Sequence, residues 1–442
     1  MDTAATNHAL VQGTVRAHGV LPHLDALAKA RYVFQPNFGL DALPEEPGVI
    51  VVRGPRQYGK STWLEHGVLA TVESFGPGSA FYLNGDELRD SDHLVRAIRE
   101  LLPSFSAHSR VRRLFIDEIT AVNNWQKAIK ILADAGELRH ILVVTTGSKA
   151  ADLRHAAERL PGRKGRLART DYLFAPLPFT EFQRVCAGLL GNDAVVAYTL
   201  AGGSPLACAQ IAEHGHIPEF VIELCRDWIV GEFSASGRQR ASLIGVMDCL
   251  HRFGASPVGQ AKLAREAGLA NNTVAAGYIE LLTDLTCVAP TFSWDASRQA
   301  IIRRRPCKYP MINSLAAVAW HPARLRNVDD FKHLDTREQA CFAEWLVAQE
   351  LWRRAAVRGD QTPEFLRYYA DQHHEIDFVV SPSLFVEVKL GSTTPLEFAW
   401  FSHTFPRARL IVISASRFET DVVRGITLED FLLGRDADAW AG

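Results

Sequence analysis

Residues 49–62 have the sequence Val-Ile-Val-Val-Arg-Gly-Pro-Arg-Gln-Tyr-Gly-Lys-Ser-Thr. The four apolar residues at the start predict a buried strand, and the loop after them has the complete G-x-x-x-x-G-K-S spacing of a P-loop. A helix is expected from Ser61 onward, and its positive N-terminal end would face a bound anion. The alternative is a chance glycine turn before a helix. The strand, the helix and both key residues together favour a phosphate-binding site in an α/β fold.

Each part of this loop has an expected role in binding ATP. Its backbone N–H groups would surround a polyphosphate, Lys60 would reach the β- and γ-phosphates, and the Ser61 hydroxyl would join the Mg²⁺ shell. The predicted nucleotide-binding residues of the loop are Gly54, Pro55, Arg56, Gln57, Tyr58, Gly59, Lys60, Ser61 and Thr62. ATP and Mg²⁺ are therefore the expected cofactors.

A second strand of the same domain ends in two carboxylates. Residues 113–118 read Arg-Leu-Phe-Ile-Asp-Glu, an apolar run followed by Asp117 and Glu118. In a Walker B segment the first acid holds Mg²⁺ through water, and the second orients and deprotonates the attacking water. We therefore expect Asp117 as a metal and nucleotide residue and Glu118 as a catalytic residue.

Two further segments of the core carry candidate residues. The apolar run 141–148 ends in Thr145, Thr146 and Ser148, and such a polar strand end lies near the γ-phosphate in nucleotide hydrolases of this layout; a plain strand end is the alternative. The basic loop 158–166 contains Arg163, an expected arginine finger, and Arg166 as a weaker candidate. A basic loop of this kind is more often simply solvated.

Composition and charge restrict the class of protein. The 442 residues are enough for two to four domains, 47% are hydrophobic, and the net charge is −2. No apolar run is long enough to span a membrane, the N-terminus lacks the features of a signal peptide, and the seven cysteines contain no C-x-x-C pair. These features predict a cytoplasmic protein with no membrane partner. The segments 110–170 and 236–310 are rich in Lys and Arg, and residues 337–442 are acidic.

The middle of the chain predicts a helix-turn-helix. Helices are expected at 260–269 and 271–285, and a two-stranded wing is expected at 287–308 with the run Arg303, Arg304 and Arg305. In a DNA reader the second helix would enter the major groove while the arginines hold phosphates. That helix offers Asn, Thr, Tyr278 and Glu side chains but no Lys or Arg, which favours a packing role over base-specific recognition.

The C-terminal part predicts a small α/β domain with a metal site. A helix is expected at 338–358, and strands are expected on either side of the turn at 381–383. Asp377 lies on the first of these strands, and Glu387 and Lys389 share one face of the next. Asp377 and Glu387 are hard oxygen ligands suited to Mg²⁺, Lys389 would stabilise a metal-bound hydroxide, and Glu344 is a further candidate. The alternative is a sheet with ordinary polar residues on an exposed face.

The combination of GPRQYGKST, LFIDEI, VVTTGS, PGRKGR, APLPFTEF and AGGSP resembles a family of prokaryotic AAA-type ATPases. In that family the ATPase core is followed by a helical lid, a winged helix and a domain resembling restriction endonucleases. The resemblance extends from about Arg31 to the end of the chain. It implies a nucleotide site of Lys60, Ser61, Asp117, Glu118 and Ser148, with Arg163 as the finger. The D…E-x-K pattern of Asp377, Glu387 and Lys389 is similar to the nuclease signature, with Ile376 in place of a common proline.

The predicted architecture is α/β: a P-loop AAA-type ATPase core (1–175), a helical lid (176–235), a winged helix (236–330) and a restriction-endonuclease-like domain (331–442). The preferred function is ATP hydrolysis coupled to Mg²⁺-dependent cleavage or binding of nucleic acid. Expected metal residues are Ser61, Asp117, Asp377 and Glu387. Expected partners are a nucleoside triphosphate, DNA or RNA, and further copies of the chain. The alternative is an ATP-driven regulatory switch in which an inactive nuclease-like domain binds a partner.

Overall fold

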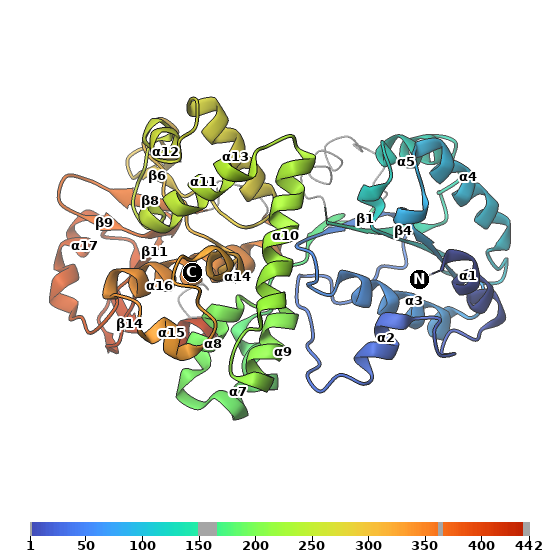
Figure 1. Ribbon diagram of the computed structural model, residues 1–442, viewed down its shortest axis with the longest axis horizontal. Helices are drawn as coiled ribbons and strands as arrows, with labels where there is room; N and C mark the ends of the chain where they lie inside the picture. The colour runs from blue at the N-terminus through green and yellow to red at the C-terminus, as the bar shows by residue number, and fades with distance from the viewer. Residues whose placement is uncertain (1, 149–165, 361–365, 436–442) are drawn as a thin grey trace. The chain divides into compact units, whose positions relative to one another are not determined.

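The computed structural model describes residues 2–148, 166–360 and 366–435. The chain divides into two compact units, Met1–Ala175 and Pro176–Gly442 (Figure 1). The finer division into four domains stays a prediction. Within the described residues, no helix combines the length and the apolar character needed to cross a membrane.

The first unit is built on one parallel sheet. Its strands are β1 (Gly48–Arg53), β2 (Ala80–Asn84), β3 (Arg113–Asp117), β4 (Leu142–Gly147) and β5 (Asp171–Leu173). They are ordered β2-β3-β4-β1-β5, and every pairing is parallel. The strands are nearly continuous apolar runs because both faces of a parallel sheet are covered by helices.

Helices lie on both faces of this sheet. They are α1 (Thr3–Gln12), α2 (Pro22–Leu27), α3 (Lys60–Phe75), α4 (Ser91–Leu101) and α5 (Trp125–Asp134), with short 3₁₀ turns at Gly85–Glu87, Leu102–Ser104 and Ile119–Ala121. Figure 1 shows α4 and α5 on one face and α1, α2 and α3 on the other. Successive residues of β1 alternate between the two cores: Val49 and Val51 pack with α4 and α5, and Ile50 and Val52 pack with α1 and α3.

The second unit begins with helices and continues with mixed structure. Its helices are α7 (Phe179–Leu190), α8 (Ala194–Ala201), α9 (Pro205–His214), α10 (Glu219–Ala235), α11 (Arg240–Phe253), α12 (Gln260–Glu266), α13 (Asn272–Asp284), α14 (Ser314–Trp320), α15 (Val328–Lys332), α16 (Thr336–Arg358), α17 (Ala399–Thr404) and α18 (Leu428–Leu432), with 3₁₀ turns at Gly191–Asp193 and Pro395–Phe398. A helix, a turn at Gly268 and a second helix are therefore present at α12 and α13. Their assignment to a winged helix stays a prediction.

Two sheets complete this unit. The first contains β10 (Phe378–Ser381), β11 (Leu384–Val388), β12 (Arg409–Ile413), β14 (Val423–Ile426) and β13 (Phe418–Glu419), in that order. The second contains β7 (Ala300–Ile301), β6 (Phe292–Asp295), β8 (Arg367–Ala370) and β9 (Glu375–Ile376). The hairpin β6–β7 lies in the predicted wing, and β6 pairs in parallel with β8. The wing thus shares a sheet with the C-terminal part, which local sequence patterns did not reveal.

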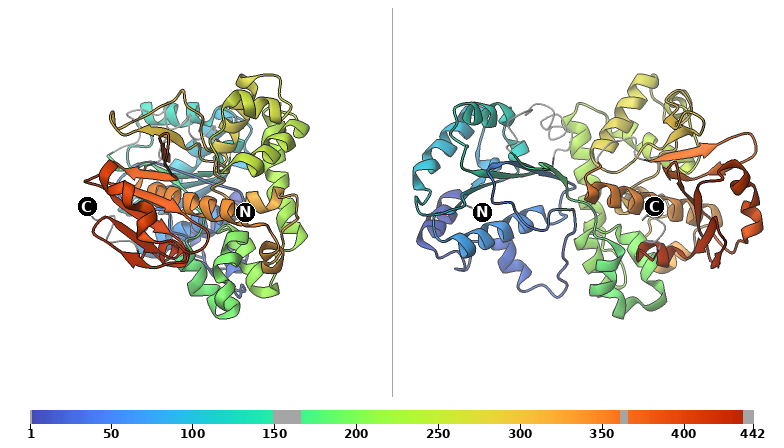
Figure 2. Two further views of the ribbon diagram at one scale, coloured as in Figure 1. Left: turned by 90° about the vertical axis from the view of Figure 1, so that its left-hand side faces the viewer. Right: turned by 180° about the vertical axis from the view of Figure 1, so that it is seen from behind.

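Helix α16 runs through the second unit (Figure 2). About half of its residues are buried. A capping box of Asp335 and Glu338 begins it, and Gly359, with a φ of 99°, ends it. Glu350 is 3% exposed, and its carboxylate oxygens lie 2.7 Å from the guanidinium nitrogens of both Arg353 and Arg354. Burial alone would raise the pKa of Glu350, but the two arginines outweigh this effect and lower it. The buried negative charge of Glu350 is therefore compensated by cations on the same helix.

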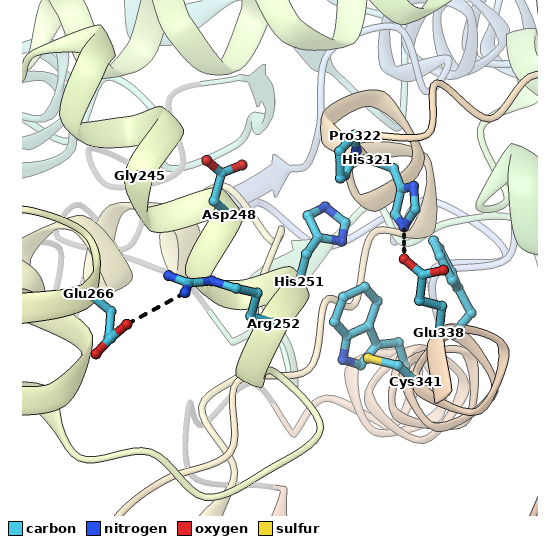
Figure 3. A pocket seen from close by; sticks show the side chains of 11 residues that line it. Gly245, Asp248, His251, Arg252, Glu266, His321, Pro322, Glu338 and Cys341 are labelled. Atoms are coloured by element: carbon cyan, nitrogen blue, oxygen red, sulfur yellow. Dashed lines mark hydrogen bonds and ion pairs between the residues drawn. The ribbon is translucent and has the colours of Figure 1, made fainter. Parts of the chain in front are cut away.

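A pocket of about 410 Å³ lies in the second unit beside α11 and α16 (Figure 3). The ring centroids of His251 and His321 in its wall are 5.0 Å apart and edge to face, and the His251 ring is 5.5 Å from that of Trp345. His321 Nε2 is 3.6 Å from Glu338 Oε1. His251 Nε2, in contrast, is buried and has no hydrogen-bond partner among the residues that the structure describes.

His251 is therefore held neutral. Burial, and to a smaller extent His321, lowers its pKa from 6.5 to about 3. Because the folded-state pKa lies below the unfolded value, the unfolded chain binds more protons between pH 6.5 and about 3. The stability of the second unit should fall as the pH is lowered through this range. His251 alone should account for about 2 kcal/mol between pH 7 and pH 5.

We predict that His251→Asn reduces the acid sensitivity of the fold, because asparagine does not titrate. Urea denaturation followed by tryptophan fluorescence at pH 7 and pH 5 should show a smaller loss of midpoint in the variant than in the wild type. His403→Asn, at an exposed position in the same unit, is the matched control and should keep the wild-type dependence. An equal loss in His251→Asn and in the wild type would contradict the assignment.

Candidate functional site

The sequence-predicted nucleotide residues meet at one edge of the first sheet. The loop 54–62 follows β1, Asp117 ends β3, and Ser148 follows β4. Strand β4 lies between β1 and β3, with Arg53 paired to Gly147 at the ends of β1 and β4. Since parallel strands end at the same edge, this order brings the loop, the Asp117–Glu118 pair and Ser148 together.

The loop has the backbone shape of a phosphate cradle. Gln57 and Gly59 have φ values of 61° and 97°, and α3 begins directly after Gly59. A Cβ at Gly59 would meet no atom within 4 Å, so the φ value is what requires glycine there. At position 54 glycine is required because of space: a Cβ there would lie 2.7 Å from the carbonyl oxygen of Phe174.

Lys60 lies inside this cradle. Its Nζ donates to the carbonyl oxygens of Gly54 at 2.9 Å and Pro55 at 2.7 Å. Burial lowers its pKa to about 8, although Glu118 and Asp117 act in the opposite direction. A buried ammonium bonded to neutral carbonyls, at the start of a 16-residue helix, is suited to an anionic ligand. Of the remaining loop residues, Arg56 and Gln57 are exposed, Pro55 and Tyr58 are buried, and Ser61 and Thr62 are half-buried.

The two carboxylates are positioned by hydroxyl groups from β4 and the residue after it. Thr146 Oγ1 donates a hydrogen bond to Asp117 Oδ1, and the backbone N–H of Glu118 also donates to this oxygen at 3.2 Å. Ser148 Oγ donates to Glu118 Oε2 at 3.1 Å. Thr145 instead donates to the carbonyl oxygen of Ile50 at 3.1 Å. Sequence reasoning left the two threonines equivalent, and the alternation of side chains along β4 distinguishes them.

Gly85 is a residue of the site that no sequence motif indicated. Glu118 has a left-handed backbone with a φ of 46°. A Cβ on Gly85 would lie 2.3 Å from the carbonyl oxygen of Glu118 and 2.9 Å from that of Asp117. The absence of a side chain at Gly85 therefore lets the Asp117–Glu118 peptide take its position. The only signal in the sequence was a glycine directly after the second strand.

The predicted arginine finger has no described position. Arg163 lies outside the described residues, and Arg166 is exposed. The finger role and the self-association that it implies stay predictions.

The second predicted site also comes together, in the Pro176–Gly442 unit. Asp377 lies between β9 and β10, and Glu387 lies on β11. The N–H of Asp377 donates to Glu387 Oε2 at 3.2 Å, and the N–H of Val388 donates to Asp377 Oδ2 at 2.9 Å. Lys389 Nζ is 2.6 Å from Glu387 Oε1. The predicted exposed-sheet alternative does not fit, because Asp377 and Glu387 are both buried.

Lys308 is the residue that sequence reasoning missed here. Its Nζ is 2.8 Å from Asp377 Oδ1, 3.2 Å from Glu344 Oε1 and 2.7 Å from Glu375 Oε1. Burial opposes its charge, but Asp377, Glu344 and Glu375 outweigh this and raise its pKa well above the ordinary value. Lys308, the last residue of the predicted wing, gave no signal of this role in the sequence, because its partners follow 36 to 69 residues later.

The carboxylates of this cluster are strongly perturbed. Burial and the proximity of Asp377 raise the pKa of Glu387 to about 8 and that of Glu344 well above its usual range. In the part of the chain that the structure describes, no group of three or more His, Cys, Asp or Glu side chains is arranged to hold a metal ion. The metal role of Asp377 and Glu387 stays a prediction, and the contact of Lys308 with Asp377 argues against it.

Comparison with known proteins assigns part of the chain. Residues 46–183 match the family model described as AAA domain. An uncharacterised protein of Methanocaldococcus jannaschii is 27% identical over 163 residues, which are 37% of this chain and 34% of that protein. The match thus spans about a third of the relative's length.

Solved structures resemble the chain at low identity. The Walker-type ATPase of Pyrococcus abyssi is 12% identical with a TM-score of 0.42, over 66% of this chain and 99% of that structure. The ORC1 protein of Aeropyrum pernix, solved in complex with DNA, is 14% identical with a TM-score of 0.33, over 73% and 93%. These values are too low for a functional comparison.

The matched segment 46–183 includes the phosphate loop, the Asp117–Glu118 pair and Ser148. Its sheet order places these elements at one edge. Residues 46–183 of this protein are therefore an AAA-type P-loop ATPase domain.

Proposed function

We propose that this protein is an ATP-driven switch in which the Met1–Ala175 unit hydrolyses ATP with Mg²⁺ and the Pro176–Gly442 unit binds a partner without cutting nucleic acid. The observation that carries the proposal is that Lys60, Asp117 and Glu118 follow or end strands β1 and β3 at one edge of the sheet, on either side of β4. This is the regulatory alternative of the sequence analysis.

The chain's own groups account for binding and proton transfer. Lys60 would exchange the carbonyls of Gly54 and Pro55 for phosphate oxygens. Glu118, oriented by the Ser148 hydroxyl, would accept the proton of the attacking water. Ser61 and Asp117 are the residues that would hold Mg²⁺, and the ion would supply charge neutralisation at the phosphates.

Cleavage of nucleic acid is left out of the proposal because of the charges around the second cluster. Asp377 is paired with Lys308, and Glu387 is paired with Lys389. Lys389 belongs to the predicted nuclease site, whereas Lys308 does not, so Lys308 is the cation that argues against a metal ion at Asp377. We expect that the wild type does not cleave single- or double-stranded DNA or RNA in the presence of Mg²⁺, with or without ATP. Any trace of cleavage should be the same in Asp377→Ala as in the wild type. Cleavage that this variant abolishes would restore the preferred function of the sequence analysis.

For the ATPase we predict different effects of two substitutions. Glu118→Gln should keep ATP binding and lower kcat by about 10²-fold or more, since it removes only the proton acceptor. Lys60→Ala should weaken ATP binding itself. Phosphate release measures turnover, and calorimetric titration with ATP measures binding.

Glu87→Gln is a suitable control for the first substitution. This exposed carboxylate lies at the turn after β2 and should leave kcat unchanged. Turnover in Glu118→Gln equal to that of the wild type would rule out Glu118 as the base.

Nucleic acid is a second candidate partner, supported by the exposure of Arg303, Arg304 and Arg305 after β7. The helix α13 is less suited to base recognition than its sequence suggested. Its Tyr278 is buried, with its hydroxyl donating to the carbonyl oxygen of Gln239 at 3.2 Å. Any binding should therefore be electrostatic and weakly sequence-selective.

We predict that changing Arg303, Arg304 and Arg305 together to glutamine weakens DNA binding and flattens its salt dependence. The slope of log affinity against log salt should decrease by about one for each arginine–phosphate ion pair that the substitutions remove. Fluorescence anisotropy over a range of salt concentrations measures both quantities. Changing the exposed Arg407 and Arg409 of the same unit is the control. If only the control weakens binding, the DNA-binding surface lies elsewhere.

A further inference from the structure

Lys308 is the most completely buried charged group of the second cluster. Its side chain is 1% exposed, and three carboxylate oxygens from Glu344, Glu375 and Asp377 lie within 3.2 Å of its Nζ. An ammonium group has three N–H donors, so three acceptors match its full capacity. The partners come from α16, from β9 and from the residue that joins β9 to β10.

The backbone of Lys308 is fixed as well as its side chain. Its N–H donates to the carbonyl oxygen of Thr291 at 3.1 Å, and its carbonyl oxygen accepts from the N–H of Thr291 at 2.9 Å. Thr291 directly precedes β6, the strand that pairs with β8. The backbone of Lys308 is therefore bridged to the residue that leads into β6, and β6 in turn pairs with β8 of the C-terminal part.

Each carboxylate oxygen of Asp377 and Glu387 already accepts a hydrogen bond or an ion pair. Asp377 uses Oδ1 for Lys308 and Oδ2 for the N–H of Val388. Glu387 uses Oε1 for Lys389 and Oε2 for the N–H of Asp377. A divalent ion at Asp377 would have to displace the ammonium, because two cations within contact distance of one buried carboxylate repel each other.

We propose that Lys308 is the resident cation of this carboxylate cluster, that it excludes divalent metal ions, and that removing its charge converts the cluster into a metal site. This proposal rests on one part of the proposed function, that the Pro176–Gly442 unit does not cleave nucleic acid, and it gives the physical reason for that property. It does not depend on ATP hydrolysis in the other unit.

The test is Mn²⁺ binding by the full chain without nucleotide, measured by calorimetry and by the loss of the free-ion electron paramagnetic resonance signal. Lys308→Met keeps an unbranched side chain, shorter by one atom, and removes the charge. This variant should bind one more Mn²⁺ per chain than the wild type, and Lys308→Met combined with Asp377→Asn should lose that ion. Lys308→Arg keeps the positive charge and should bind no additional ion.

The stability of the same variants gives a second readout. Lys308→Met leaves buried carboxylates without their cation, so it should have a lower Tm than the wild type in the absence of metal. Mn²⁺ at about 100 times its Kd should raise the Tm of this variant by about 5 °C. The same concentration should not raise the Tm of the wild type or of Lys308→Arg.

A second measurement does not need Lys308→Met and therefore tests the proposal even if that variant does not fold. The Mn²⁺ isotherms of the wild type and of Asp377→Asn should superimpose, because the wild type binds no metal at Asp377. Metal binding by the wild type that Asp377→Asn removes would overturn the proposal, as would a folded Lys308→Met that binds no additional ion. ATP turnover of each sample, measured in parallel, reports separately on the proposed ATPase.

Discussion

The parallel pairing of β1 with β4 is the constraint on which the first unit depends. It fixes Arg53 opposite Gly147, so the phosphate loop and the hydroxyl-bearing end of β4 leave the sheet at the same edge. Strand β3 on the other side of β4 adds Asp117. The strands are held by two cores, one on each face, and the residues of β1 contribute alternately to both. A change in register by one residue would reverse these contacts and separate the loop from the carboxylates.

The second unit depends on compensated buried charge. Helix α16 carries Glu344 and Glu350, and both are buried. Glu350 finds its cations one turn later on the same helix, whereas Glu344 finds Lys308, which lies 36 residues earlier in the chain. Removing one member of such a pair leaves a charge without compensation and costs about 3–5 kcal/mol. The local pair stabilises the helix, and the distant pair joins α16 to the segment around β6.

Individual residues show how far the sequence could be interpreted. The loop 54–62 and the Asp117–Glu118 pair were found because each is a contiguous motif with fixed spacing at the end of an apolar run. Thr146 could not be separated from Thr145, since only the direction of each side chain from β4 decides which one reaches Asp117. Tyr278 was included among the side chains that its helix offers to DNA, but tertiary packing buries it against Gln239. Position 85 requires glycine because the carbonyl oxygens of Asp117 and Glu118 approach it closely, and this contact could not be seen in the sequence.

The sequence by itself determined the type of chemistry in the first unit, because a phosphate loop is made from consecutive residues whose backbone and side chains act together. It also brought Asp377, Glu387 and Lys389 into one candidate cluster through the alternation of side chains on neighbouring strands. Only the tertiary structure decided which cation lies in that cluster. Lys308 and its three carboxylates are far apart in the chain, and no local pattern encodes their meeting. Lys308 is bridged to Thr291, β6 pairs with β8, and β8 pairs with β9, which carries Glu375. These long-range pairings exist only in the folded protein.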